Sequence, residues 1–151
     1  MKATFGAGCF WGVEEAFRTL KGVTKTTVGY MGGTIKNPTY EQVCSDKTGY
    51  VEVCQVEFDS KVISYGQLLD KFWKIHDPTQ ENRQGPDVGT QYRFVIFYHS
   101  EEQKQVAEES LGKQQEIIGK KIRTTIEKAK EFYKAEDYHQ KYLMKKSLKT
   151  C

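Results

Sequence analysis

The first twenty residues join a short, glycine-rich apolar stretch to a helical pattern, and a cysteine stands at the junction. Residues 3–8 (ATFGAG) predict a strand that runs into a tight turn, and residues 10–20 continue as a helix. Cys9 would then lie at a helix N-terminus, where unpaired amides and the helix dipole favour the thiolate. The same spacing also suits a small buried cysteine, so nucleophile and core residue both remain open.

The size and charge of the chain limit the function classes. Its 151 residues are enough for one domain, 1–151, with a core that needs no disulfide support, and no repeat, linker or low-complexity segment divides it. A net charge of +3, without a basic stripe interleaved with aromatic residues, argues against a nucleic-acid partner. No apolar run reaches the roughly 20 residues needed to cross a membrane.

The cysteines indicate redox chemistry rather than structural bridges. Because the N-terminus lacks the apolar region of a secretory signal, we expect a cytoplasmic protein, and its 4 cysteines are expected to be catalytic, redox-cycling or free thiols. There is no CxxC motif and no histidine spacing typical of a ligand cluster, so we expect no metal site.

The order of the predicted elements is irregular. Strands are expected over 21–31, 50–58, 91–99 and 122–126, and helices after capping-box patterns at Ser64 and Ser100. Residues 34–49 and 77–89 read as loops, the first with a helical turn at 40–44, and the chain after residue 128 reads as irregular. This order predicts an α+β fold, a mixed sheet with helices on one or both faces.

One strand carboxylate is the best partner for the Cys9 thiol. Residues 50–58 alternate with a period of two, so Glu52 shares a face with Cys54 and Val56. If that face is buried, the neutral acid is favoured and Glu52 becomes a proton donor. If the opposite face is buried, Glu52 is a solvated carboxylate.

Other candidates lie in loops and beside the cysteine. Tyr40, Tyr92 and Asp87 could hold an oxygen that gains negative charge, although any of the 9 tyrosines could equally be packing. Phe10 and Trp11 could form an apolar wall for a methyl or thioether group, or simply pack in the core. Two histidines, His76 and His139, are expected on a helix face or the surface rather than in catalysis.

Several motifs in the same order carry a resemblance to a known family. The chain is similar to peptide methionine sulfoxide reductase A, the class specific for the S epimer, over nearly its whole length. The segments that match are GCFWG at 8–12, GYMGG at 29–33, NPTYEQVC at 37–44, TGYVE at 48–52, FWKIHDPTQ at 72–80, QGPDVGTQYR at 84–93 and AEDYHQ at 135–140.

The resemblance implies a fold and a set of roles. The fold would be a two-layer α+β sandwich around a mixed sheet, with an irregular C-terminal tail. Cys9 would be the catalytic cysteine and Glu52 the acid. The sulfoxide oxygen would be bound by Tyr40, Tyr92 and Asp87, and the substrate methyl by Phe10 and Trp11. No cofactor would be required, thioredoxin would be the reductant, and the protein would be a monomer.

Two positions depart from the family pattern, and the resolving thiol is open. Tyr50 stands where histidine is usual, and Pro86 stands where asparagine is common. A second thiol would condense with the Cys9 sulfenic acid to a disulfide. Cys151 is favoured because the family often uses tail cysteines; Cys54 and direct reduction by an external thiol are the alternatives.

Two other functions fit a reactive cysteine. One is an oxidant sensor that binds oxidised methionine without turnover, and the other is a cysteine hydrolase, which would need a histidine or lysine base beside Cys9.

Overall fold

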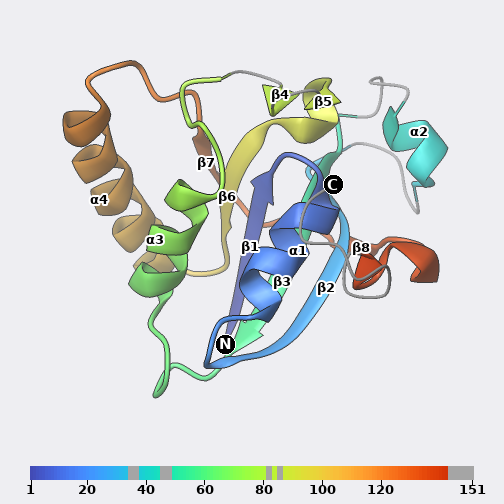
Figure 1. Cartoon of the computed structure of the whole chain (residues 1–151), viewed down its shortest axis with the longest axis horizontal. Helices are drawn as coiled ribbons and strands as arrows, with labels where there is room; N and C mark the ends of the chain where they lie inside the picture. The colour runs from blue at the N-terminus through green and yellow to red at the C-terminus, as the bar shows by residue number, and fades with distance from the viewer. Residues whose placement is uncertain (34–37, 45–48, 81–82, 85–86, 143–151) are drawn as a thin grey trace.

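The computed structural model describes residues 1–33, 38–44, 49–80, 83–84 and 87–142. In that part of the chain a six-stranded sheet runs in the order β7-β6-β1-β3-β2-β8 (Figure 1), and β4 and β5 form a separate two-stranded ribbon. The strands are β1 (Lys2–Ala7), β2 (Val23–Met31), β3 (Val51–Phe58), β4 (Arg83–Gln84), β5 (Asp87–Val88), β6 (Phe94–Tyr98), β7 (Thr125–Lys128) and β8 (Tyr133–Lys134).

The sheet is mixed, as the sequence predicts. β6 and β7 pair in parallel, whereas β1 with β3, β1 with β6, β2 with β3 and β2 with β8 are antiparallel. The first strand of the chain therefore lies inside the sheet, with β3 on one side and β6 on the other. In the β2–β3 pair Tyr30 lies opposite Glu52, which places the candidate acid in an inner strand.

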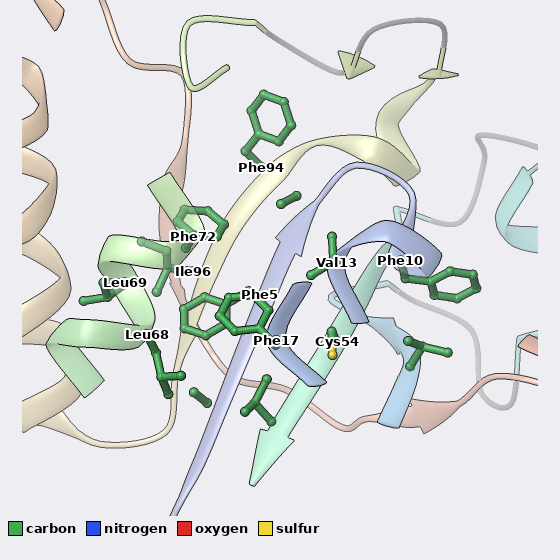
Figure 2. Close-up of a cluster of buried hydrophobic side chains, with 14 of the residues drawn as sticks. Phe5, Phe10, Val13, Phe17, Cys54, Leu68, Leu69, Phe72, Phe94 and Ile96 are labelled. Carbon is green, nitrogen blue, oxygen red and sulfur yellow. The ribbon is translucent and has the colours of Figure 1, made fainter. Parts of the chain in front are cut away.

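Helices α1 (Phe10–Arg18), α3 (Tyr65–Lys74) and α4 (Glu101–Ile118) pack on the sheet, whereas the short helix α2 (Tyr40–Cys44) is drawn apart from it in Figure 1. There are also two short 3-10 turns, η1 (Thr90–Tyr92) and η2 (Asp137–His139). Between α1, α3 and the sheet lies the main core (Figure 2), where Phe5 stacks on Phe17 at 5.0 Å and on Phe72 at 5.3 Å between ring centres. Burying such apolar rings is the dominant favourable contribution to folding.

The opposite face carries a smaller cluster. Its buried members are Met31, Val51, Val53, Val95 and Phe97, and Ala129 and Phe132 pack against them. β3 and β6 are therefore buried on both faces, although the alternation in 50–58 had pointed to one buried face. The predicted α+β sandwich with a mixed sheet and helices packed on it is confirmed.

The predicted capping box is complete at the start of α3 but only half formed at the start of α4. At α3 the Ser64 hydroxyl accepts the Gln67 N–H and the Gln67 side chain accepts the Ser64 N–H, so the box is complete. At α4 the Ser100 hydroxyl accepts the Gln103 N–H, but the Gln103 side chain bonds instead to the His99 N–H and the Lys2 carbonyl. That side chain thus joins the start of α4 to β1.

Some predicted boundaries are wrong by a few residues. The strand expected from 91 begins at Phe94, because the backbone turns through η1, with the Tyr92 N–H bonded to the Gly89 carbonyl at 3.1 Å. The loop over 77–89 contains the β4–β5 ribbon, and the last predicted strand runs over 125–128 rather than 122–126.

The stretch after residue 128 is more regular than predicted, because β8 pairs with the edge of β2. This pairing needs Gly29, since a Cβ there would lie 2.3 Å from the Tyr133 carbonyl oxygen. None of the helices in the described segments is long and apolar enough to cross a membrane.

Candidate active site

Cys9 lies at the point where β1 ends and α1 begins. It is the N-cap residue of α1, with extended backbone angles (φ −60°, ψ 124°), and its carbonyl accepts the Val13 N–H at 3.4 Å. Gly8 before it has φ 86°, a left-handed conformation that glycine adopts without strain and that lets the strand turn into the helix. The predicted position of this half-buried thiol at a helix N-terminus is confirmed.

Glu52 reaches the same helix end from β3. Its side chain is 1% exposed, on the face that also carries Cys54 and Val56. Oε1 of Glu52 accepts the backbone N–H of Phe10 at 3.2 Å, one residue after the cysteine. The reading of Glu52 as a solvated carboxylate is therefore wrong. Burial removes water from an acid of this kind and favours its neutral form, and the amide bond fixes its orientation.

Aromatic rings surround this helix end. Phe10 is 1% exposed, and its ring centre lies 5.8 Å from Tyr30, 6.3 Å from Tyr40 and 5.0 Å from His139. Trp11 stacks on Tyr142 with 3.9 Å between ring centres and an angle of 13° between the ring planes. The two residues that follow the cysteine therefore belong to one aromatic cluster, which draws rings from four separate parts of the chain.

The other predicted oxygen-binding residues come from loops around the sheet. Tyr40 opens α2, and its ring centre lies 4.5 Å from that of His139. Tyr92, half-buried, is the last residue of η1, which packs against the Glu52 strand β3. Asp87 begins β5, where it pairs with Gln84; its side chain lies outside the described part of the molecule. The structure thus brings Tyr40 into the aromatic cluster and packs η1, which carries Tyr92, against β3.

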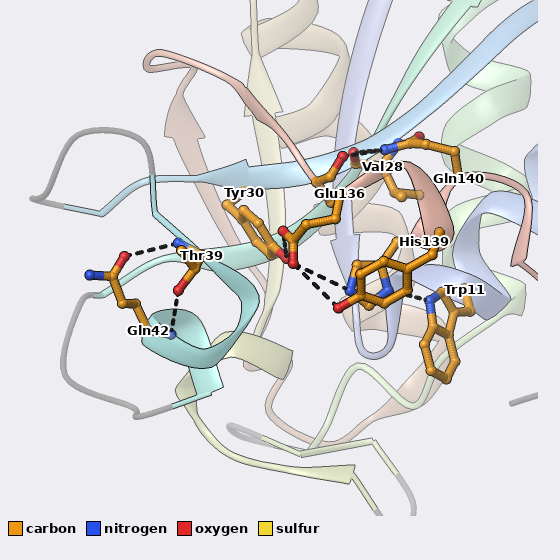
Figure 3. A network of polar contacts seen from close by, with 10 residues as sticks. Trp11, Val28, Tyr30, Thr39, Gln42, Glu136, His139 and Gln140 are labelled. Carbon is orange, nitrogen blue, oxygen red and sulfur yellow. Dashed lines mark hydrogen bonds and ion pairs between the residues drawn. The ribbon is translucent and has the colours of Figure 1, made fainter.

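His139 is the residue that the sequence reasoning missed. It was expected on a helix face or the surface, but it is 1% exposed, and Nδ1 accepts the indole N–H of Trp11 at 2.9 Å (Figure 3). Burial lowers the pKa of this imidazole, partly opposed by the charge of Glu136. The signal that could have found it is the aromatic run around it, since Tyr138 and Tyr142 flank it in sequence.

His76 is buried as well, but its partners are structural. Nδ1 lies 2.7 Å from the Phe72 carbonyl and Nε2 lies 3.3 Å from the Thr124 hydroxyl. Burial lowers the pKa of His76 to about 4. Its ring packs on Phe72, Trp73 and Phe94 in the α3 region of the core. The expectation that it does not take part in catalysis agrees with these contacts, and of the two expected positions the helix face fits better than the surface.

The two candidate resolving cysteines differ in what can be said of them. Cys54 is a free thiol with no exposed surface, and burial, followed by the charge of Glu14, raises its pKa well above the usual range. Cys151 lies outside the described residues.

Comparisons with known proteins agree on one family. The model of the family described as peptide methionine sulfoxide reductase matches residues 1–151. The chain is 59% identical over 152 residues to peptide methionine sulfoxide reductase MsrA of Methanothermobacter thermautotrophicus, covering 99% of this chain and 90% of that one.

Solved structures give the same answer. The reduced form of Mxr1 from Saccharomyces cerevisiae superposes with a TM-score of 0.93 at 40% identity, covering 97% of this chain and 86% of the yeast chain. Mxr1 in complex with Trx2 superposes with a TM-score of 0.67 at 30% identity, covering 94% and 84% of the two chains.

Proposed function

This chain belongs to the peptide methionine sulfoxide reductase family, and we propose that it reduces methionine S-sulfoxide, free or in proteins, to methionine through a cysteine sulfenic acid. The observation that carries the proposal is the bond from the Phe10 N–H to Oε1 of Glu52. This bond holds a buried carboxyl group at the N-terminus of α1, the helix end that Cys9 caps, and so supports an acid and a nucleophile that act on one substrate.

The first step transfers one oxygen atom. Glu52 donates a proton to the sulfoxide oxygen, and since Oε1 already accepts the Phe10 N–H, we assign that proton to Oε2. The Cys9 thiolate attacks the sulfoxide, the sulfur–oxygen bond of the substrate breaks, and the oxygen leaves with the Cys9 sulfur. Methionine is released reduced, and Cys9 is oxidised to the sulfenic acid, which carries the proton that Glu52 gave.

Two groups of residues bind the substrate in this scheme. Tyr40 and Tyr92 donate hydrogen bonds to the sulfoxide oxygen, since phenol hydroxyls are good donors at neutral pH, and Asp87, which the resemblance groups with them, contributes to the same set in its protonated form. Phe10 and Trp11 bind the substrate methyl group. Support comes from the cluster itself, where Phe10 packs near Tyr40 and Trp11 stacks on Tyr142, so that both rings lie in apolar surroundings directly after Cys9 in the chain.

The second step returns Cys9 to its thiol. A second cysteine condenses with the sulfenic acid to a disulfide and water, and an external dithiol reduces the disulfide by exchange. We assign the resolving thiol to Cys151 rather than Cys54, because the Cys54 thiol has no exposed surface and its thiolate is disfavoured.

Thioredoxin is the proposed reductant, in line with the yeast relative that was solved with Trx2. A dithiol reductant and the free Cys54 thiol suit a reducing compartment such as the cytoplasm. The scheme uses no organic cofactor and no metal, and it needs a single copy of the chain.

One assay tests the proposal. The protein is incubated with each epimer of a blocked methionine sulfoxide and dithiothreitol, and methionine formation is followed. We expect turnover of the S epimer only, and none with Cys9→Ser. Binding of the sulfoxide without release of methionine would identify a sensor of oxidised methionine instead. Peptide mapping after one equivalent of substrate identifies the resolving cysteine, and a Cys9–Cys54 bridge would reject our assignment.

A further inference from the structure

A second buried carboxylate lies in α1 and has no part in the proposed reaction. Glu14 is 1% exposed. Its Oε2 accepts the Thr26 hydroxyl at 2.9 Å, and its Oε1 accepts the backbone N–H of Lys141. Because Thr26 is in β2 and Lys141 follows η2, this one side chain connects the first helix, the second strand and the C-terminal part of the described chain.

The residue that Glu14 binds has an unusual backbone conformation. Lys141 has φ 52°, the one positive φ found for a non-glycine residue in the described segments. A side chain disfavours this left-handed conformation, so contacts around it must hold it in place. Gln140 supplies one set, since its side chain bonds to both the N–H and the carbonyl of Val28 (Figure 3). The Glu14 carboxylate supplies the other contact, since it accepts the Lys141 N–H.

The side chains of two residues that flank this turn contact the Trp11 indole. His139, before the turn, accepts the indole N–H at 2.9 Å, and Tyr142, after the turn, stacks on the indole at 3.9 Å. The orientation of Trp11 therefore depends on contacts from both sides of Lys141, in addition to its own place in α1. The left-handed residue therefore lies between the two side chains that contact the indole.

We propose that Glu14 is a positioning residue for this reductase: through the N–H of Lys141 it holds Tyr142 and His139 against Trp11, and so sets the shape of the methyl-binding wall. This inference rests on the proposed function, in which Trp11 contacts the substrate methyl. Glu14 itself touches neither the substrate nor Cys9 in this scheme. Its effect is on substrate binding rather than on the chemical step.

Substitutions at Lys141 test the bond between Glu14 and the Lys141 N–H without changing a buried side chain, because the Lys141 side chain is exposed. Lys141→Pro removes the N–H and fixes φ near −65°. The residue before it already suits a proline, since Gln140 has φ −69° and ψ 123°. Lys141→Gly is the matched control: it also removes the side chain, but it keeps the N–H and adopts φ 52° without strain.

Substitution at Glu14 tests the same bond from the other side. Glu14→Leu removes both acceptors. Glu14→Gln preserves the bonds, because its carbonyl oxygen can accept the Lys141 N–H while its amide donates to the Thr26 hydroxyl. Glu15→Gln is the control for loss of a carboxylate, since the Glu15 carboxylate pairs with Arg18 on the same helix. If Glu14→Leu fails to fold, the comparison of Lys141→Pro with Lys141→Gly still tests the inference.

Two readouts are needed. The KM and kcat of each variant are measured with a blocked methionine S-sulfoxide, and the fluorescence of Trp11 is recorded in a Trp73→Phe background, which leaves Trp11 as the one emitter of the 2 tryptophans. We expect Lys141→Pro and Glu14→Leu to raise KM about fivefold or more with little change in kcat, and to shift the Trp11 emission. Lys141→Gly, Glu14→Gln and Glu15→Gln should match the parent.

Several results would overturn the inference. It fails if Lys141→Gly behaves like Lys141→Pro, if KM stays constant while the emission shifts, or if neither readout changes. The Trp11→Ala variant distinguishes a failure of this inference from a failure of the proposed methyl-binding role of Trp11. If Trp11→Ala leaves KM unchanged, the methyl-binding role of Trp11 is wrong; if it raises KM while Lys141→Pro does not, only the positioning role of Glu14 is wrong.

Discussion

Trp11 and His139, 128 positions apart in the chain, are joined by a hydrogen bond of 2.9 Å from the indole N–H to Nδ1. A ring nitrogen that accepts a hydrogen bond carries no proton, so His139 is neutral while the bond exists, with its proton on Nε2. That nitrogen lies 3.9 Å from Oε2 of Glu136, whose other oxygen accepts the Tyr30 hydroxyl at 3.3 Å. The bond therefore makes the environment of Trp11, a residue of the proposed methyl-binding wall, depend on the protonation state of one histidine.

Substrate binding should weaken in acid. Burial lowers the pKa of His139 below its usual 6.5, so the ring is neutral at pH 7 and gains a proton at Nδ1 only as the pH falls through that lowered value. The acceptor for Trp11 is then lost. We expect the KM for a blocked methionine S-sulfoxide, measured in steady-state assays, to rise as the pH falls below the usual histidine value of 6.5. Trp11→Phe, which lacks the donor, should show a smaller rise; an equal rise would contradict this explanation.

Glu52→Gln should slow sulfenic acid formation without unfolding the protein. The amide keeps the acceptor for the Phe10 N–H but cannot donate a proton to the sulfoxide oxygen. Loss of a general acid typically costs about 10²–10⁴ in rate. The measurement is the single-turnover rate of methionine release. Glu57→Gln, on the opposite face of the same strand, is the control and should react at the parent rate. An unchanged rate in Glu52→Gln would remove Glu52 from the acid role.

His76 should make the fold less stable in acid. Burial lowers its pKa from 6.5 to about 4, so the unfolded chain binds a proton more readily than the native one. The free energy of unfolding therefore falls as the pH drops from about 7 to about 4, by roughly 3 kcal/mol from this group. Urea denaturation of the parent and of His76→Gln at several pH values measures the difference. If the free energy of unfolding depends on pH in the same way in both proteins, His76 does not contribute to the loss of stability in acid.

Two glycines should respond oppositely to alanine. A Cβ at Gly29 would lie 2.3 Å from the Tyr133 carbonyl oxygen and 2.6 Å from the Phe132 ring, so Gly29→Ala must push β8 away from β2. We expect a loss of about 1–3 kcal/mol. A Cβ at Gly112 in α4 meets nothing within 4 Å. Gly112→Ala should therefore stabilise the helix by about 0.5–1 kcal/mol. Thermal unfolding of the two variants compares these effects directly.

Local patterns were sufficient for the elements that place Cys9 and Glu52. The glycines before Cys9 indicated the strand-to-helix turn, the alternation in 50–58 put Glu52 on one face with Cys54 and Val56 without deciding which face is buried, and Ser64 with Gln67 marked the start of α3. Each of these signals lies within a few residues of the feature it predicts. The resemblance to a known family then supplied the roles, which the residues alone had left open.

Features that depend on distant contacts could not be read in this way. His139 is buried because side chains of α1 and α2 pack against it in η2. The spacing of apolar residues within one segment cannot predict such contacts between distant segments. β8 forms because Gly29, about a hundred residues earlier, leaves room for its backbone. The Gln103 side chain leaves the expected capping box because it can reach the carbonyl of Lys2. In each case the deciding partner is remote in sequence.

The place of β1 inside the sheet has a consequence for synthesis of the protein on the ribosome. Residues 2–7 leave the exit tunnel well before their hydrogen-bonding neighbours, residues 54–57 and 94–97. This strand therefore stays unpaired on one edge until residues 94–97 have been made. Contacts this remote slow folding. Chaperones that shield nascent apolar segments should consequently engage the amino-terminal strand, and a slow-translating stretch placed before residue 94 would prolong that exposure.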